Sequence, residues 1–432
     1  MYQSSYPDRK IIPTNQTSKE LNLRNPEHFV LANGLNLYYI EAGLEDVARI
    51  DIVVGAGSKF QEKLLCASST SSLLKEGTKD LSSNQIAEKL DFHGAYLTSS
   101  IGKDKSVITL FSLTKHLSKL LPILSNILCE PLFSENEFNV HIDRNRQEFL
   151  INSEKARYIA NREFNTLMFG RGTAYGQFLQ LDDFDKINTT DIKNYHSTYY
   201  QPKNSYIIVS GRPDAESKKL ISNLFGNQWQ NNKYKIKEPS NIISTPFQGE
   251  KLIEKEKFLQ SAIRVGQNVI NKFDKDYSKL LFTNTILGGY FGSRLMSNLR
   301  EDKGLTYGVS SFMTNFMHGS YFAITTEVNI DQTAVAMDEI KKELTILQND
   351  KTSEDEINLV KNYIFGNFLK NFDGPFALAE MFRSVHDFGL NFDSYKLNLD
   401  KIMNTTSEDV LAIAQKHLDS NNMTSLVVGK FE

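Results

Sequence analysis

The sequence contains very little cysteine, with only Cys66 and Cys129 among its 432 residues. Two cysteines so far apart are typical of reduced, buried thiols and not of a disulfide-stabilised scaffold. Long apolar runs are absent too, since no stretch approaches the ~18 consecutive apolar residues that span a bilayer. The formal net charge is only −3, so neither a nucleic acid nor an anionic membrane is expected as the main partner.

Two further absences concern targeting and metal binding. The first residues, MYQSSYPDRKIIPTNQ, lack the apolar core of a secretory signal. We therefore expect a cytoplasmic protein, or a periplasmic one if a signal peptide was removed. The eight histidines are dispersed, and no two of them lie three or four residues apart. The sequence therefore has no histidine pair that would bind a metal from one face of a helix.

The length of the chain predicts more than one domain, because 432 residues exceed what one ordinary core contains. Residues 226–250 are rich in Asn, Gln, Lys, Pro and Ser, which is typical of a linker. We therefore expect a polar N-terminal arm at 1–25, a first domain at 26–225 and a second domain at 251–432.

The two predicted domains share a pattern. The segments DKINTTDIKNYHSTYYQPKNSYIIVSG (185–211) and DKIMNTTSEDVLAIAQKHLDSNNMTSLVVG (400–429) both contain "DKI", a Thr-Thr helix start, a helix, a polar break and a strand that ends in Gly. Helix pairs expected at 117–155 and 331–372 correspond as well. The distance between the two segments, from 185 to 400, is far longer than the repeat of a solenoid, so it indicates duplicated domains. Each half mixes helices with strands, so the predicted class is α+β, each domain a mostly antiparallel sheet packed with helices.

The segment GGYFGSRLMSNLREDKGLTYG (288–308) contains the strongest local signals. Its two leading glycines interrupt an apolar helical run. A helix is expected from Ser293 to Asp302, because apolar residues recur there at helical spacing. Gly304 then follows as a C-terminal stop. The Thr, Tyr, Val and Phe content of 305–312 predicts a strand.

Arg300 and Tyr307 lie on either side of that glycine stop. A guanidinium offers forked donors and a phenol adds one more. Together they are suited to hold a carbonyl oxygen that becomes negative during acyl transfer. The alternative is that Arg300 is a solvated helix charge and Tyr307 an ordinary strand aromatic. Residue types and spacing alone leave both interpretations open.

The same segment resembles the second-domain signature of the pitrilysin/insulysin-type peptidases (the inverzincins), especially the mitochondrial processing peptidase branch. The shared elements are a Gly pair, "FGSRL", an Arg, and seven residues later a Tyr within "GLxY". The resemblance covers nearly the whole chain after residue 25. It implies two similar domains that form half of a closed chamber. It also implies that Arg300 and Tyr307 contact a substrate carbonyl opposite a zinc ion.

The metal-binding motif of that family is missing. Active members carry H-x-x-E-H on a helix just before "LxxGT". Alignment on LLKEGT (73–78) places Ser68, Ser69, Thr70, Ser71 and Ser72 at that motif. Hydroxyl groups are weak zinc ligands and cannot act as the base near neutral pH. The resemblance therefore implies that this chain binds no metal.

Two acidic positions further along the chain belong to the same comparison. Glu148 occupies the downstream ligand position, but His141 replaces the second Glu of the family. One carboxylate does not hold a catalytic zinc, so Glu148 is interpreted as a plain helix carboxylate. A serine nucleophile among residues 68–72 is a further alternative, but the sequence places no activating base with it.

A candidate peptide-binding element lies in GAYLTSS. By the resemblance, Gly94, Ala95, Tyr96, Leu97 and Thr98 align with the edge strand that captures peptides by strand addition. Leu97 stands where the family usually has Asn, which is a departure from the pattern.

The combined prediction is the non-zinc subunit of a heterodimeric zinc peptidase. It would close the chamber and donate Arg300 and Tyr307 to the active site of a homologous partner that carries H-x-x-E-H and the zinc. Peptides are the expected substrates, and no activity is expected from this chain alone. The alternative is an inert structural or scaffolding homologue that binds peptides or partner proteins. A self-sufficient metalloprotease is excluded by the missing ligands.

Overall fold

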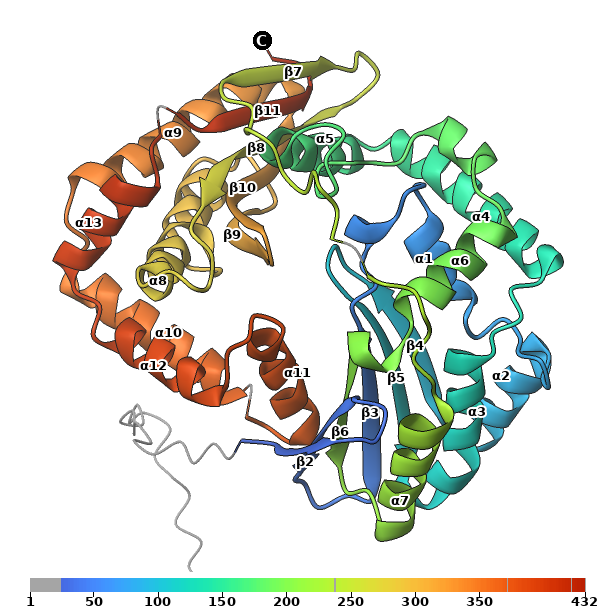
Figure 1. Ribbon diagram of the computed structural model, residues 1–432. Coiled ribbons are helices and arrows are strands. Elements are labelled where there is room, and N and C mark those ends of the chain that lie inside the picture. Colours follow the sequence, from blue (N-terminus) through green and yellow to red (C-terminus); the bar gives the residue numbers. More distant parts are fainter. Residues whose placement is uncertain (1–24, 237, 371, 421, 432) are drawn as a thin grey trace, which may run out of the picture.

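The computed structural model describes residues 25–236, 238–370, 372–420 and 422–431. The arm predicted at 1–25 lies outside these residues except for its last position. The described chain forms two halves, each built on its own β-sheet with helices packed against it (Figure 1). This arrangement confirms the predicted α+β class with a duplicated architecture.

The first sheet has six strands in the order β1-β2-β6-β3-β5-β4. The pair β2–β6 is parallel, and the other pairs are antiparallel. The strand β4 pairs with β5 on one side and forms one edge of the sheet. The strands are β1 (Glu27–Val30), β2 (Asn36–Glu41), β3 (Val47–Val54), β4 (Tyr96–Ile101), β5 (Ser106–Leu113) and β6 (Ser205–Gly211).

The second sheet has five strands in the order β7-β11-β8-β10-β9. The pair β7–β11 is parallel, and the other pairs are antiparallel. The strand β9 forms one edge of this sheet, as β4 does in the first. The strands are β7 (Glu250–Glu254), β8 (Gln260–Val269), β9 (Val309–Phe316), β10 (Gly319–Asn329) and β11 (Thr424–Gly429).

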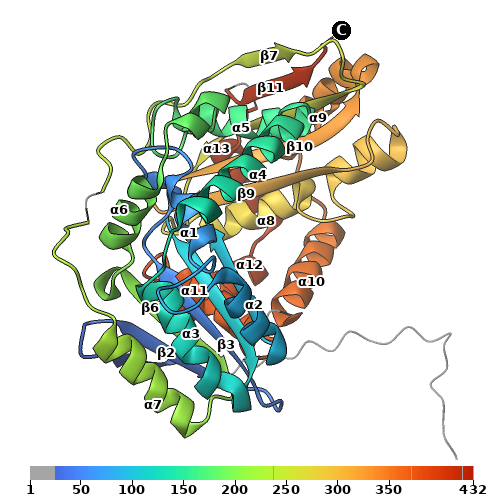
Figure 2. The same ribbon diagram turned by 90° about the vertical axis from the view of Figure 1, so that its right-hand side faces the viewer.

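The helices of the first half are α1 (Cys66–Leu73), α2 (Ser83–Phe92), α3 (Leu117–Cys129), α4 (Glu135–Ser153), α5 (Ala156–Phe169), α6 (Thr189–Tyr199) and α7 (Ala215–Asn223). Helices α2 and α3 cover the face of the first sheet that points away from the second half (Figures 1 and 2). Short 3-10 turns occur at Ser58–Phe60, Thr114–His116, Leu181–Asp185 and Pro202–Asn204, and a π-helical turn at Leu224–Gln228.

The helices of the second half are α8 (Tyr277–Gly288), α9 (Thr333–Asn349), α10 (Glu354–Lys370), α11 (Pro375–His386), α12 (Phe392–Met403) and α13 (Ser407–His417). A π-helical segment runs over Met296–Asp302, and a 3-10 turn over Ile330–Gln332. Within the described ranges, no helix combines the length and the apolar character needed to cross a bilayer.

Side-chain caps set where several helices begin. Ser82 accepts a hydrogen bond from the Gln85 N–H, and the Gln85 side chain accepts one from the Ser82 N–H. This capping box satisfies two of the N–H groups that a helix start leaves unpaired. It confirms the predicted start of α2.

The duplication is visible in the order and sense of the strands. Helix α6 precedes β6, and α13 precedes β11. Each of these strands lies between one parallel and one antiparallel neighbour. Both helices begin with a capping box, formed by Asn188 with Asp191 and by Thr406 with Asp409. The segments 185–211 and 400–429 therefore occupy equivalent places in the two halves.

Each half contributes helices to the sheet of the other half. From the first half, α5 lies against the second sheet, where Ile159 and Phe164 join one buried cluster with Ala262, Ala323 and Leu426 (Figure 1). Because α5 and α11 follow equivalent helix pairs, the exchange is reciprocal.

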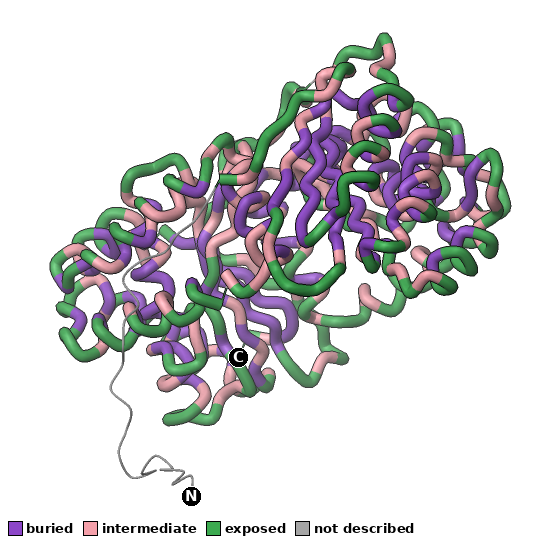
Figure 3. Tube along the Cα trace, turned by 90° about the horizontal axis from the view of Figure 1, so that it is seen from below, coloured by how far each residue is buried: buried purple, intermediate pink, exposed green. Residues whose placement is uncertain are grey.

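The reverse contact brings α11 and α12 onto the first sheet. Ala379, Phe382 and Phe392 cluster with residues of that sheet that include Val53 and Ile208. Burial of apolar surface on both sheets fixes the two halves relative to each other. Figure 3 shows buried positions along many of the strands, with exposed positions in both the helices and the connections.

The segment that connects the two sheets packs against the first half. Trp229 is buried in the core of the first half. The N–H groups of Ala174 and Tyr175 donate to the carbonyls of Asn241 and Ile242, at 2.9 and 3.0 Å. The proposed linker at 226–250 therefore lies along the segment that follows α5.

The strand predicted at 305–312 begins only at Val309. The residues before it form a turn, because Thr306 Oγ1 accepts from the Gly308 N–H at 3.1 Å and donates to the Glu327 carbonyl at 2.7 Å. The predicted stop at Gly304 is present, with φ at +62°. Tyr307 is therefore a turn residue and not a strand aromatic.

Candidate functional site

The helix α1 carries hydroxyl side chains where the resemblance expects metal ligands. Ser71, at the position of the general base, accepts from Ser106 Oγ at 3.1 Å, and Ser106 accepts from the Tyr200 hydroxyl at 3.1 Å. Ser69, Thr70 and Ser71 are all buried. These hydroxyls therefore satisfy each other and neighbouring backbone groups, as buried polar atoms must.

The structure places a base next to one of these serines, so the prediction that none is present was wrong. His141 Nε2, from α4, lies 3.2 Å from Ser69 Oγ. Burial lowers the pKa of His141 to about 4, so its imidazole is neutral at neutral pH. Asn145 Nδ2 donates to the His141 carbonyl at 2.7 Å.

This Ser69–His141 pair is not arranged for catalysis. Ser69 is 0% exposed and His141 is buried, so a peptide carbonyl cannot reach the hydroxyl. The hydrogen bond instead joins α1 to α4. One signal for this contact was present in the sequence: His141 stands at the position where the aligned family members carry a Glu.

The residues at this position do not fit a zinc ion. A catalytic zinc needs three protein ligands drawn from His, Cys, Asp and Glu. Glu148 is exposed on α4. Throughout the part of the chain that the structure describes, no three such side chains are grouped to hold a metal. The neutral hydroxyls of Ser68 and Ser72 do not substitute for imidazoles.

The second-half candidates Arg300 and Tyr307 lie close together. The Arg300 guanidinium carbon is 5.4 Å from the centre of the Tyr307 ring and 4.6 Å from the centre of the Phe291 ring. Tyr307 is 92% exposed, and Phe291 is exposed too. Cation–π contacts of this kind orient a guanidinium without using its N–H donors. The sequence analysis did not single out Phe291, although it lies in the same motif.

Arg300 differs from the other arginine of its segment. Arg294 is held by Glu356 through two bonds of 2.8 and 2.7 Å. Arg300 forms no hydrogen bond and no ion pair with any described residue. Its N–H donors are therefore open to a ligand, whereas those of Arg294 serve the fold.

The candidate peptide strand lies at a sheet edge. Gly94, with φ at +59°, and Ala95 lead into β4, which carries Tyr96, Leu97 and Thr98. The side of β4 away from β5 has no partner strand among the described residues. Tyr96 is exposed, whereas Leu97 is buried. The geometry suits strand addition, and peptide capture by these five residues stays a prediction.

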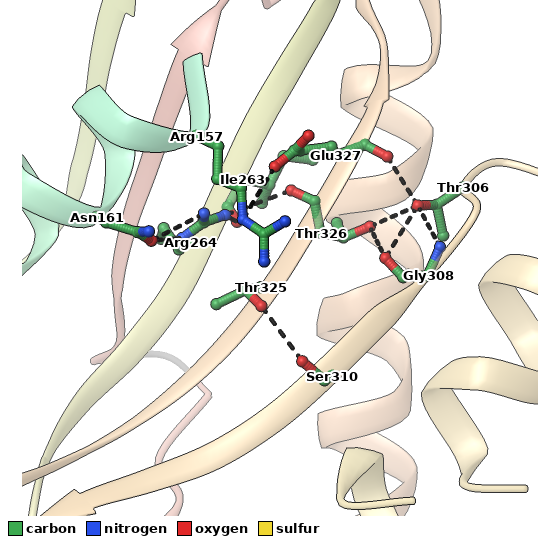
Figure 4. A network of polar contacts seen from close by, with 10 residues as sticks. All are labelled: Arg157, Asn161, Ile263, Arg264, Thr306, Gly308, Ser310, Thr325, Thr326 and Glu327. Carbon is green, nitrogen blue, oxygen red and sulfur yellow. Dashed lines mark hydrogen bonds and ion pairs between the residues drawn. The ribbon is translucent and has the colours of Figure 1, made fainter. Parts of the chain in front are cut away.

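The structure also shows a polar cavity that the sequence analysis missed. It has a volume of about 360 Å³ and is lined by Tyr307, Arg157, Arg264 and Glu327 among others. Figure 4 shows that Arg157 comes from α5 and Arg264 from β8, so the two halves meet here. A charged Arg264 within the apolar strand segment SAIRVG was the available sequence signal.

Comparison with known proteins gives two family matches. Residues 39–171 match the model described as "Insulinase (Peptidase family M16)". Residues 186–364 match the model described as "Peptidase M16 inactive domain". The two matches are consecutive and together span most of both halves.

Several known proteins are similar to this chain at low sequence identity. An uncharacterized zinc protease YmxG of Bacillus subtilis is 22% identical over 74% of this chain and 78% of its own length. The mitochondrial-processing peptidase subunit beta of Saccharomyces cerevisiae is 22% identical over 97% and 92%. The non-peptidase homolog YmxG of Helicobacter pylori is 22% identical over 90% of each chain.

A solved structure shares the fold. A peptidase M16 inactive domain from Pseudomonas fluorescens superposes with a TM-score of 0.86 at 20% identity, and it covers 95% of this chain and 99% of that one. At this identity the match establishes the architecture alone.

Proposed function

We propose that this chain, which belongs to the insulinase (M16) family of peptidases, is the non-zinc subunit of a heterodimeric zinc peptidase. It is an inactive-type homologue, because serines stand at the metal-binding positions of α1. Its homologous partner would carry H-x-x-E-H and the zinc. This chain would close the chamber and complete the active site of that partner.

The observation that carries the proposal is the state of Arg300. A guanidinium that lies beside two aromatic rings and has no carboxylate partner is oriented yet uncommitted. A structural arginine of the same segment, Arg294, is committed to Glu356. The proposal thus explains why one arginine is kept available beside an exposed tyrosine.

The chemistry assigned to this pair is stabilisation of a developing oxyanion. The Arg300 N–H groups and the Tyr307 hydroxyl would donate to the carbonyl oxygen of the peptide bond under attack. Such donors act most strongly as negative charge develops, so they lower the barrier more than they tighten substrate binding. The bond-breaking groups themselves would belong to the partner.

The peptide would be held in extended form by this chain as well. The open edge of β4 offers backbone N–H and C=O groups for strand addition. We assign this role to residues 94–98. The buried Leu97 would support the strand from below, and the exposed Tyr96 would flank the peptide.

The second candidate is a scaffold that binds peptides or partner proteins without taking part in chemistry. The printed name of the Helicobacter pylori relative, a non-peptidase homolog, favours it. The hydroxyl network of α1 favours it too, because hydroxyl groups occupy the positions of the metal ligands and bond to one another. The free pair of Arg300 and Tyr307 favours the half-enzyme instead.

A cytoplasmic location belongs to the same proposal. Cys66 and Cys129 are both free thiols, and burial raises the pKa of each to about 12. Such thiols suit a reducing compartment but do not require it. Fractionation of the native host, with cytoplasmic and periplasmic marker proteins, tests the location directly.

The experiment for the main proposal is reconstitution. This chain and a homologous H-x-x-E-H subunit from the same genome are purified separately and mixed. The half-enzyme account expects a stable heterodimer that cleaves unstructured peptides, while each subunit alone is inactive. A zinc subunit that is fully active alone, and gains nothing on mixing, would contradict it.

A further inference from the structure

The cavity beside Tyr307 contains an excess of positive charge. Of the described residues that line it, two are arginines and one, Glu327, is acidic. Arg157 Nε lies 3.6 Å from Glu327 Oε1, which pairs these two charges. Arg264 is left without a carboxylate within ion-pair distance among the described residues.

Arg264 is the group that makes this cavity unusual. It is only 3% exposed. Its Nε and Nη2 donate to Asn161 Oδ1 at 3.0 and 2.9 Å, and Nη1 donates to the Ile263 carbonyl at 2.7 Å. All of these acceptors are neutral. Burial lowers the pKa of Arg264 to about 10, which still leaves it charged at neutral pH.

Glu327 is the one carboxylate near Arg264 in this cavity, and it is already paired with Arg157. Arg264 is therefore only partly neutralised, and an anion that enters beside it relieves the remaining cost of the buried charge. Arg157 adds a second guanidinium at the mouth, where its side chain is 74% exposed. The remaining wall is polar, with Ser310 and Thr325 hydroxyls 3.3 Å apart (Figure 4). A small anionic group with hydrogen-bond acceptors suits this lining better than an apolar one does.

We infer that this cavity is a subsite for a carboxylate of the bound peptide, held by Arg264 and Arg157 next to Tyr307. The inference rests on the proposed function for its ligand and names the substrate class: peptides with an acidic residue, or a free C-terminus, close to the bond held by Tyr307. The turn that carries Tyr307 forms one wall of the cavity. A carboxylate bound there would therefore fix the peptide in register with the proposed oxyanion donors.

The test measures peptide binding to this chain alone by titration calorimetry. Three short acetylated peptides of otherwise neutral sequence are compared: one with a single Glu and an amidated end, one with Gln in its place, and the Gln peptide with a free C-terminal carboxylate. We expect at least one carboxylate peptide to bind about tenfold tighter than the uncharged one. The first peptide assigns the carboxylate to a side chain, and the third assigns it to the C-terminus.

Substitutions test whether the tighter binding of carboxylate peptides arises in this cavity. Arg157→Gln changes an exposed side chain and should leave the fold intact, while Arg264→Met removes the buried charge. Both substitutions should abolish the preference, so that the carboxylate peptides and the uncharged peptide bind with about equal affinity. Arg171→Gln, at an exposed arginine outside the cavity, is the matched control and should keep the preference.

Several outcomes overturn the inference: equal affinity for all three peptides, no measurable binding, or loss of the preference in the Arg171 control as well. The measurement needs no partner subunit and no turnover. A failure of the heterodimer to cleave peptides would therefore count against the proposed function without touching this result.

Discussion

The guanidinium carbon of Arg300 lies 5.4 Å from the centre of the Tyr307 ring, although the two residues belong to different local structures. Arg300 lies within the π-helical segment Met296–Asp302, and Tyr307 lies in the turn before β9. The glycine at 304, with positive φ, reverses the chain between them. The contact therefore depends on the whole segment and not on two isolated side chains.

Phe291 should help to orient the Arg300 guanidinium, although it is not one of the two proposed donors. Phe291→Ala removes one of the two rings next to Arg300 and keeps both donors. An exposed cation–π contact contributes about 0.5–1 kcal/mol, so turnover by the reconstituted heterodimer should fall about two- to fivefold. Phe273→Ala, at another exposed phenylalanine, is the control and should leave kcat unchanged. Equal kcat values in the two variants would remove Phe291 from the account.

The purified chain should bind no stoichiometric zinc. The positions of the metal motif hold Ser68, Ser71 and Ser72, and the described residues offer no alternative ligand group. Elemental analysis after dialysis against zinc should find far less than one ion per chain. One tightly held zinc per chain, with chelator-sensitive peptide cleavage, would contradict the assignment of an inactive-type first half.

Removal of the Ser69 hydroxyl should weaken the fold without any effect on the proposed site. Ser69→Ala removes the 3.2 Å partner of His141 Nε2 and leaves only Asn145 Nδ2, at 3.2 and 3.3 Å, beside the two ring nitrogens. Loss of one such hydrogen bond costs about 0.5–1.5 kcal/mol, which denaturant unfolding would detect. Ser68→Ala, at a partly exposed neighbour, is the matched control and should change stability by less than about 0.5 kcal/mol. Equal effects of the two substitutions would show that the Ser69–His141 contact is unimportant.

Acid should destabilise the chain through two buried histidines. Burial lowers the pKa of both His141 and His196 to about 4. Both are neutral when folded, and the unfolded chain takes up their protons near pH 6.5. Their stabilising contribution is therefore complete above pH 6.5 and is lost as the pH falls towards 4.

The expected loss is about 2 kcal/mol per histidine by pH 5. His141→Gln removes one of the two groups, so its unfolding free energy should fall less steeply between pH 7 and 5 than that of the unmodified chain. The difference between the two curves isolates His141 from the carboxylates. Parallel curves would mean that His141 is not buried in its neutral form.

Local rules in the sequence explain much of the fold. The Ser82–Gln85 capping box and the repeated helix–break–strand pattern depend on residues that are close in sequence, so their structures follow from spacing. The late start of β9 was missed because Thr306 reaches the Glu327 carbonyl of the neighbouring strand, a contact that no local pattern reveals. Tertiary hydrogen bonds overrode strand propensity there.

The contacts of the candidate site follow from the sequence only in part. Arg300 and Tyr307 lie seven residues apart in one motif, and the motif positions both. The Ser69–His141 bond joins residues 72 positions apart. Arg157 and Arg264 come from different halves and meet only because α5 crosses to the second sheet. Such contacts depend on how the duplicated halves exchange helices.

The most direct test of the half-enzyme account is the kcat of the heterodimer after both donors are changed. Arg300→Ala with Tyr307→Phe should lower kcat by about 100-fold or more, because loss of one oxyanion donor alone has that effect, while KM, assembly and thermal melting stay nearly unchanged. Arg300→Lys should restore little, since a point charge lacks the guanidinium fork. Full turnover with both residues replaced would contradict the account and establish the scaffold as the better description.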